Sequence, residues 1–388
     1  MPRGATLDTE KAVQKRYGRA ARAPEEALCC PVSYDPRYLK VIPAEILERD
    51  YGCGDPSRFL RPGDTVLDLG SGAGKICFIA AQIVGPTGKV IGVDFNPEML
   101  ALARKHQPAI AARLGYDNVA FHRVRIQDLA LPLDEVDAYL KSRPVRSATT
   151  LTDFEAFAER LRRAAPLLPD QSVDVIVSNC VLNLVKEADK EKLFSEMHRA
   201  LKRGGRVAIS DIVSDEDVPD TLKHDSELWS GCLAGALRED KFLEAFERAG
   251  FYGIQLEKYD EKPWQTVRGI QFRSVTVTAR KGKEGPCLER YQAVIYKGPW
   301  KEVRDDDGHI LRRGQRVAVC DKTYNLLTQV PYAGDIIPVP PVREFPLRKA
   351  RGFACGGAAV RDPRETKGKR YRKTVAPTRS VCGPEGCC

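Results

Sequence analysis

Residues 66–74, VLDLGSGAG, constrain the fold of this chain more than any other stretch. Val66, Leu67 and Leu69 form a short apolar run that is typical of a buried parallel strand. The glycines at 70, 72 and 74 allow a tight turn and a close approach to a ligand. The apolar run KICFIAAQIV at 75–84 then predicts a helix that ends at Gly85-Pro86. Strand, glycine turn and helix follow in the order that a nucleotide-type ligand requires.

The glycine spacing distinguishes between two kinds of cofactor. The glycines follow G-x-G-x-G rather than the G-x-G-x-x-G of NAD sites, and Asp68 lies inside the preceding strand. Together with VIGVDFNPEMLALAR, this resembles the first two motifs of S-adenosylmethionine (SAM) methyltransferases. The resemblance implies that Gly70, Gly72 and Gly74 make room for the methionine part, and that Asp94 binds the ribose diol. NAD binding and a purely structural turn are the less favoured alternatives.

Further strands are predicted at 119–124, 173–177, 206–211 and 272–278, with helices between them. This alternation predicts an α/β fold with a doubly wound Rossmann-like sheet. The resemblance implies that the sheet is of the class I SAM-dependent methyltransferase type. Because ligands bind at the carboxyl ends of such strands, Ile126 and Gln127, or instead Asp128, are expected to bind the adenine. The remaining residues assigned to the cofactor are Tyr51, Asp68, Ser71, Phe95, Met99 and Asn179. Residues 131–170 interrupt the alternation and predict a helical pair inserted over the site, the second helix starting at Thr152-Asp153.

Charge and hydropathy argue against a membrane partner and a nucleic-acid partner. The chain has 388 residues, enough for two domains or for one domain with a tail. It contains no 18-residue apolar run, and its charged N-terminus has no signal-like core, so we expect a cytoplasmic protein without a membrane partner. Residues 341–388 carry twelve Lys or Arg against four Asp or Glu, a net +8 of the total +9. We interpret this as a solvated basic tail and expect no nucleic-acid partner.

The twelve cysteines of the chain have no zinc-type spacing, since C-x-x-C is absent, and no signal peptide supports a disulfide framework. Cys53 lies between two glycines, Cys180 follows a predicted strand and Cys232 lies among small residues. These settings predict accessible thiols on loops near the ligand turn. Cys77, on an apolar helix face, is expected to be buried. No role is predicted for Cys287, Cys320 and Cys355.

A set of motifs in fixed order carries a second, more specific resemblance. It comprises Tyr17-Gly18, Cys29-Cys30, YGCGDP, the glycine turn, VSNCVLNLV and LWSGCLAGALRED, then QAVIYKG, RRGQRVAV and a final GCC. Together these closely resemble arsenite SAM methyltransferases over nearly the whole chain. The resemblance implies that Cys53, Cys180 and Cys232 bind trivalent arsenic, with either Cys29 or Cys30 as the N-terminal thiol. It also implies glutathione or thioredoxin as the thiol reductant.

The residue types suit that chemistry. Soft trivalent arsenic prefers thiolates, and three sulfurs leave its lone pair free to attack a methyl group, so no general base is needed. None of the five histidines lies in a motif that calls for catalysis. Attack formally oxidises arsenic, and we hypothesise that Cys29 or Cys30 closes a disulfide with Cys53 to return it to the trivalent state.

Four segments are predicted. They are an N-terminal helical, arsenic-binding segment at 1–50, a methyltransferase domain at 51–283, a small C-terminal α+β domain at 284–345 and a flexible basic tail at 346–388. Neither the 131–170 insertion nor the Pro- and Arg-rich tail matches a family motif.

Two other functions remain open. One is a SAM-dependent methyltransferase for an organic small molecule, in which the cysteines are incidental. The other is a thiol protein that binds a metalloid without catalysis. The first predicts activity that survives loss of Cys180 and Cys232, and the second predicts metalloid binding without SAM binding.

Overall fold

The computed structural model describes residues 8–25, 28, 32–355 and 360–367. The chain divides into two compact units, Met1–Gly282 and Lys283–Cys388. The division falls one residue before the predicted boundary between 283 and 284. Among the described residues, no helix has both the length and the apolarity that a membrane span requires.

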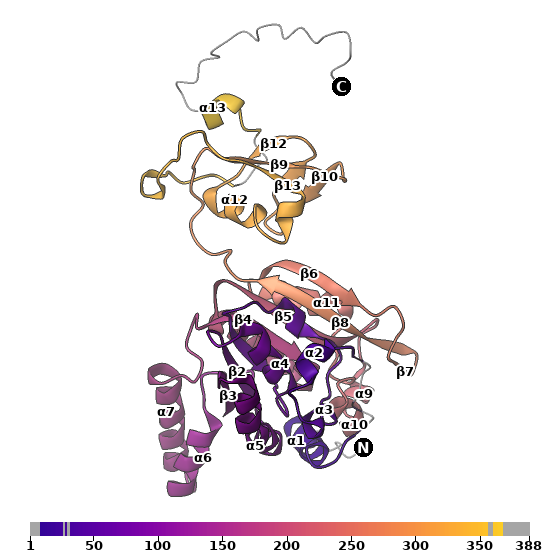
Figure 1. The fold of residues 1–388 in the computed structure, drawn as a ribbon. Helices are drawn as coiled ribbons and strands as arrows, with labels where there is room; N and C mark the ends of the chain where they lie inside the picture. The colour runs from indigo at the N-terminus through magenta and orange to yellow at the C-terminus, as the bar shows by residue number, and fades with distance from the viewer. Residues whose placement is uncertain (1–7, 26–27, 29–31, 356–359, 368–388) are drawn as a thin grey trace. The chain divides into compact units, whose positions relative to one another are not determined.

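The first unit is built on an eight-stranded sheet with the order β3-β2-β1-β4-β5-β8-β6, in which β7 pairs with β8 (Figure 1). The strands β1 to β5 pair in parallel, whereas β8 runs antiparallel to both β5 and β6. The sheet extends from β1 in both directions, to β2 on one side and to β4 on the other. Such a change of direction opens a crevice at the carboxyl ends of these strands. The strands are β1 Thr65–Leu69, β2 Lys89–Asp94, β3 Val119–Arg123, β4 Val173–Asn179, β5 Leu201–Ser214, β6 Tyr252–Tyr259, β7 Gln265–Val267 and β8 Ile270–Arg280.

Alternate side chains of the central strands bury two separate cores. Val66 packs in a cluster with apolar side chains of α4 and α5. Leu67 and Leu69 point to the opposite face and pack with α8 and α11. Helices therefore cover both faces, as the predicted doubly wound class requires. These helices are α4 Lys75–Val84, α5 Pro97–Leu114, α8 Glu187–Ala200 and α11 Glu239–Arg248.

The insertion forms the predicted helical pair, α6 Leu133–Ser142 and α7 Ala148–Ala164, side by side at the β3 end of the sheet (Figure 1). The two helices hold each other through Tyr139, which stacks on Phe157 with ring centroids 4.1 Å apart. Ser147 caps α7, so this helix begins four residues before the predicted start at 152. The predicted position over the site is wrong, because no residue of either helix lines the pocket described below.

The N-terminal elements belong to the first unit and are not a separate segment. Asp8 caps α1, Thr9–Ala20, by accepting a hydrogen bond from the Lys11 amide. α1 packs against α5 and α10. The remaining short elements of this unit are α2 Pro36–Leu39, α3 Ala44–Leu47, η2 Pro56–Phe59, η3 Leu182–Leu184, α9 Asp220–Lys223 and α10 Ser226–Ser230.

The second unit contains a three-stranded antiparallel sheet, β12-β9-β13, and a two-stranded hairpin, β10-β11. Val294 of β9 and Leu327 of α12 pack in its small apolar core. Its elements are β9 Ala293–Tyr296, β10 Glu302–Arg304, β11 Ile310–Arg312, β12 Arg316–Ala318, α12 Asp321–Leu327, η4 Tyr332–Gly334, β13 Ile336–Val339, η5 Leu347–Lys349 and α13 Pro363–Lys367.

Part of the predicted flexible tail is folded onto this second unit. Gly352 forms a bridge with Leu288, and the Phe353 amide donates to the Cys287 carbonyl at 2.9 Å. Arg361 is 5% exposed and forms an ion pair with Glu289 at 2.8 Å. The boundary predicted at 346 is therefore too early, because backbone pairing and a buried arginine hold later residues in place.

Candidate active site

A pocket that is partly open to solvent lies at the carboxyl ends of β1, β2 and β4. The predicted cofactor residues that line it are Tyr51, Asp68, Gly70, Ser71, Gly72, Asp94, Phe95, Met99, Ile126, Gln127 and Asn179. Gly74 does not line it. A side chain at Gly74 would lie 2.8 Å from Phe121, so this glycine is needed for packing behind the turn.

The glycine turn is held by backbone hydrogen bonds to β2. The amides of Gly70 and Ser71 donate to the Val93 carbonyl at 2.8 and 2.9 Å, and the Gly72 amide donates to the Asp94 carboxylate at 2.9 Å. Gly70 has φ +70°, and a Cβ there would lie 2.4 Å from Val181. The turn therefore requires glycine on both conformational and steric grounds.

Polar groups around the turn suit a ligand such as SAM. Ser71 Oγ is buried and has no hydrogen-bond partner among the described residues, so it can bond a polar ligand group. Burial raises the pKa of the Asp68 carboxyl to about 7. Burial likewise raises the pKa of Asp94. Two carboxylates beside an apolar pocket favour a ligand that carries positive charge, as the sulfonium and ammonium groups of SAM do.

One wall of the pocket comes from α1, which the sequence did not predict to lie there. Glu10, Val13 and Tyr17 line the pocket from one face of this helix. Arg125 and Gln127 donate to the Glu10 carboxylate, with distances of 3.1 and 3.4 Å to Oε1. The spacing of three and four residues between these α1 side chains was the available signal, since it places them on one helix face.

Cys53, Cys180 and Cys232 come together in one apolar cluster beside the pocket. They are 1%, 5% and 3% exposed, so the expectation of accessible thiols is wrong. The small residues around them do not open the loops to solvent; they let backbone segments pack closely. A Cβ at Gly52, for example, would lie 2.1 Å from Asn179 Nδ2.

Two of the three cysteines have an unusual backbone. Cys180 and Cys232 have φ of +62° and +63°, a left-handed conformation that costs side-chain-bearing residues energy. The Cys232 thiol donates to the Cys180 carbonyl at 3.1 Å, and Tyr17 Oη lies 3.9 Å from Cys232 Sγ. Cys180 also lines the cofactor pocket, so it connects this pocket to the thiol cluster.

The three sulfurs do not all lie within 4.8 Å of one another; within the described ranges only another set of cysteines meets that limit. A shared ion would therefore have to draw the sulfurs of Cys53, Cys180 and Cys232 together.

Asn179 holds the loop that carries Cys53. Its Oδ1 accepts hydrogen bonds from the Cys53 amide at 2.8 Å and the Gly54 amide at 3.1 Å. Its Nδ2 donates to the Gly54 carbonyl at 2.8 Å. Ser274 Oγ donates to the Cys53 carbonyl at 2.6 Å. Because Asn179 also lines the pocket, one side chain joins the β4 end, the cofactor pocket and the Cys53 loop.

A buried carboxylate holds the turn after Cys180. Asp211 accepts hydrogen bonds from the amides of Val181 at 3.2 Å and Leu182 at 2.8 Å. Burial raises its pKa to about 6, and burial lowers the pKa of nearby Lys190 to about 8. Asp211 could not be predicted from the sequence, because its role depends on the adjacency of β4 and β5, which no local motif reveals.

The other predicted cysteines have different outcomes. Cys77 is fully buried, as predicted, and its thiol donates to the Asp68 carboxylate at 3.1 Å. Cys29 and Cys30 lie outside the described residues, so their predicted role stays a prediction.

Comparison with known proteins indicates the family of this chain. Residues 60–165 and 150–250 match a methyltransferase domain family, and residues 283–371 match a domain family of unknown function. Over 342 residues the chain is 32% identical to an arsenite methyltransferase of Aquipseudomonas alcaligenes, covering 83% of this chain and 88% of that one. It is 27% identical to a human arsenite methyltransferase, covering 90% and 86%.

A solved structure gives the same result. The crystal structure of an arsenic(III) SAM methyltransferase from Chlamydomonas reinhardtii matches 85% of this chain and 99% of its own, with 28% identity and a TM-score of 0.53. The glycine turn, the acidic residues beside it and the likeness to these enzymes identify a SAM-dependent methyltransferase. The chain belongs to the arsenite methyltransferase family.

Proposed function

We propose that this enzyme transfers methyl groups from SAM to trivalent arsenic, taking arsenite and methylarsenite as substrates and serving arsenic detoxification. The observation that carries the proposal is the cluster of Cys53, Cys180 and Cys232 beside the cofactor pocket. Three buried cysteines, two of them in a strained conformation, exceed what packing alone requires.

The thiols would act as ligands of the substrate. Arsenite exchanges its hydroxyl groups for cysteine sulfurs, and soft arsenic prefers them. The Asn179 clamp fixes the backbone of Cys53, and Asp211 fixes the turn after Cys180. These two side chains are positioning residues, because they act on the loops and not on the arsenic.

The cofactor pocket would orient the methyl donor. Gly70 and Gly72 would let the methyl donor come close to the protein backbone. Asp94 would accept hydrogen bonds from the ribose hydroxyls, and Ile126 and Gln127 would flank the adenine. When bound, SAM supplies an electrophilic methyl group on its sulfonium sulfur. Cys180 belongs to both sites, so arsenic held there lies next to the methyl donor. Close alignment of two bound reactants gives effective molarities of ~10⁵ M or more, which accounts for catalysis without a base.

Turnover would also need a reductant. Methyl transfer removes two electrons from arsenic in formal terms, and two protein thiols that form a disulfide return them. Cys29 or Cys30 with Cys53 remains our predicted pair, and glutathione or thioredoxin would reduce the disulfide. We place the enzyme in the cytoplasm because a reducing compartment keeps the ligand cysteines available as thiols.

The test is arsenic speciation by liquid chromatography coupled to mass spectrometry. Purified protein is incubated with arsenite, SAM and glutathione or thioredoxin, beside the Cys180→Ser/Cys232→Ser double variant. We expect methylated arsenicals from the wild type and none from the variant. Methylation that persists in the double variant would refute the thiol site, and no methylated arsenic from SAM-binding wild type would favour an organic substrate.

A control separates chemistry from folding. Cys232 does not line the cofactor pocket, so the Cys232→Ser variant should bind S-adenosylhomocysteine with unchanged affinity by isothermal titration calorimetry. Loss of that binding would mean that the substitution disturbs the fold, and the speciation result would then need the Cys53→Ser variant instead.

A further inference from the structure

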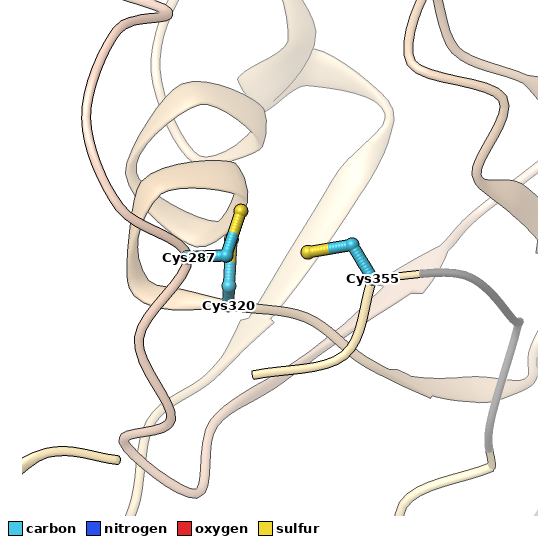
Figure 2. A group of neighbouring side chains, drawn as sticks. All are labelled: Cys287, Cys320 and Cys355. Carbon is cyan, nitrogen blue, oxygen red and sulfur yellow. The ribbon is translucent and has the colours of Figure 1, made fainter. Parts of the chain in front are cut away.

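Three cysteines of the second unit, none of which lines the pocket of the first unit, form a group of their own. The sulfurs of Cys287, Cys320 and Cys355 all lie within 4.8 Å of one another. Figure 2 shows the Cys355 side chain directed toward the other two, which lie together near the start of a helix. In the part of the chain that the structure describes, no other group of three Cys, His, Asp or Glu side chains lies so close together.

The group joins three separated parts of this unit. Cys287 precedes the sheet, Cys320 caps α12 and Cys355 lies on the returning C-terminal segment. Backbone hydrogen bonds bring these parts together, from the Asp321 amide to Leu288 at 2.8 Å and from the Phe353 amide to Cys287 at 2.9 Å. The sulfurs therefore converge because the backbone places them there.

One thiol of this group is buried, and the other two are partly exposed to solvent. Cys320 is fully buried, and the Thr323 amide donates to its sulfur at 3.4 Å. Cys287 and Cys355 are half-buried. An ion can thus approach from the side of the two half-buried thiols and be held against the buried one.

The number of sulfur ligands in this group favours trivalent arsenic over zinc. Structural zinc almost always has four protein ligands in a tetrahedron, and this group offers three within reach of one another. Trivalent arsenic binds three sulfurs in a pyramid, and its lone pair takes the fourth direction. Binding of arsenous acid breaks three As–O bonds and forms three As–S bonds. Each thiol proton leaves with a hydroxyl group as water, and no electron is transferred.

We propose that Cys287, Cys320 and Cys355 form a second binding site for trivalent arsenic. The choice of arsenic among soft ions rests on the proposed function of the enzyme, whereas the three-thiolate site itself rests on the geometry of the second unit. In contrast to those of Cys53, Cys180 and Cys232, these sulfurs already lie close enough to share one ion.

The experiment measures arsenic bound to the full chain. Reduced protein is mixed with arsenite without SAM, separated from unbound arsenite by gel filtration, and analysed by inductively coupled plasma mass spectrometry. The Cys53→Ser/Cys180→Ser/Cys232→Ser background removes the three thiols of the proposed substrate site. In that background, adding Cys287→Ser, Cys320→Ser and Cys355→Ser should remove one arsenic atom per chain. X-ray absorption at the arsenic edge should report three sulfur neighbours for the atom that is lost.

A matched control uses cysteines outside the described residues. Adding Cys382→Ser, Cys387→Ser and Cys388→Ser to the same background should leave that arsenic atom bound. The single Cys355→Ser change, at a half-buried position, should also remove it and guards against misfolding of the triple variant. Equal arsenic binding with and without Cys287, Cys320 and Cys355 would overturn the proposal. Zinc bound by the purified protein and lost with these cysteines would also overturn it.

The two proposals fail separately. Wild type that produces no methylated arsenic in the speciation assay refutes the proposed function, whatever the second site binds. Methylation with no arsenic lost on removal of the second cysteine group refutes only the inference about that group.

Discussion

At the scale of single residues, the strained backbone of Cys180 and Cys232 indicates that these positions hold cysteine for its thiol and not for the stability of the fold. A left-handed conformation costs an L-residue roughly 1–2 kcal/mol relative to glycine, and both cysteines adopt it, with φ of +62° and +63°. Glycine would satisfy the backbone at either position. Cysteine therefore stands there at the expense of stability, which indicates a functional use of the sulfur.

This strain can be measured at Cys232. Cys232→Ala keeps a Cβ in the left-handed conformation, whereas Cys232→Gly removes it. We expect the Gly variant to be more stable than the Ala variant by about 1 kcal/mol in urea unfolding, and both to lose arsenite methylation. An Ala variant as stable as the Gly variant would contradict the strain.

Asp68 makes cofactor binding depend on pH. Burial raises its pKa to about 7, and a cationic ligand group favours the ionised form. Below pH 7, the dissociation constant of S-adenosylhomocysteine should therefore rise by up to about tenfold per pH unit. Isothermal titration calorimetry between pH 6 and 8 measures this dependence. It should disappear in the Asp68→Asn variant, and the same slope in both proteins would exclude Asp68 as its source.

The sign for stability is opposite. Because the folded-state pKa of Asp68 lies above the ordinary aspartate value of 3.8, the protonated carboxyl favours folding at low pH. That contribution is lost as the pH rises from about 4 to about 7. Without cofactor, wild type should thus lose thermal stability relative to Asp68→Asn over this interval, as differential scanning fluorimetry can show.

At the scale of elements, the turn between β4 and η3 depends on a carboxylate from the neighbouring strand β5. Asp211 accepts from two amides of the turn and from Asn183 Nδ2 at 2.9 Å. The parallel pairing of β4 with β5 brings Asp211 to this position, where Asn179 pairs with Ser210. Sheet register thereby decides where the Cys180 backbone lies.

Removing this acceptor should disturb the proposed arsenic site more than the proposed cofactor site. Asp211→Ala leaves buried amides without partners, and each unsatisfied group costs about 1–3 kcal/mol. Because Asp211 accepts from more than one buried group, we expect a loss of unfolding free energy of at least about 1–3 kcal/mol. We also expect a KM for arsenite that rises more than the KM for SAM. Asp211→Asn keeps one acceptor oxygen and should lie between wild type and the Ala variant. A KM that rises only for SAM would contradict the positioning role.

The α1 wall is tied to the rest of the pocket by a partly exposed ion pair. Arg125 binds Glu10 at 3.1 Å, and the two side chains are 42% and 31% exposed. Exposed pairs contribute about 0.2–1 kcal/mol. Glu10→Gln should therefore weaken cofactor binding only a few-fold, without changing arsenite binding by the reduced apo protein. Fluorescence titration with S-adenosylhomocysteine measures the effect, and an unchanged affinity would show that α1 stays in place without the pair.

At the scale of the whole molecule, local patterns predicted the sheet well and the assembly of the site only in part. The run VLDL and the glycines after it specify β1 and its turn through neighbouring residues, so they could be read directly. The burial of Cys53 could not be predicted, because it depends on Asn179 and Ser274, which are distant in sequence. Glycines around a cysteine are compatible with either an open loop or close packing.

The second unit shows the same limit. Cys287, Cys320 and Cys355 are separated by more than thirty residues each, so no spacing rule joins them. The segment from residue 346 onward was predicted to be a flexible tail because it is rich in Pro and basic residues. Its contacts, such as that of Arg361 with Glu289, become visible only in three dimensions.

The unequal burial of the two cysteine groups implies an order of chemical attack. Cys287 and Cys355 are half-buried, whereas Cys53, Cys180 and Cys232 are at most 5% exposed. A bulky maleimide should consequently label the first pair well before the second group, as peptide mass spectrometry over a time course can follow. Large electrophiles would then spare the sulfurs of Cys53, Cys180 and Cys232 while the fold stays closed, and a small neutral molecule such as arsenous acid could still reach them.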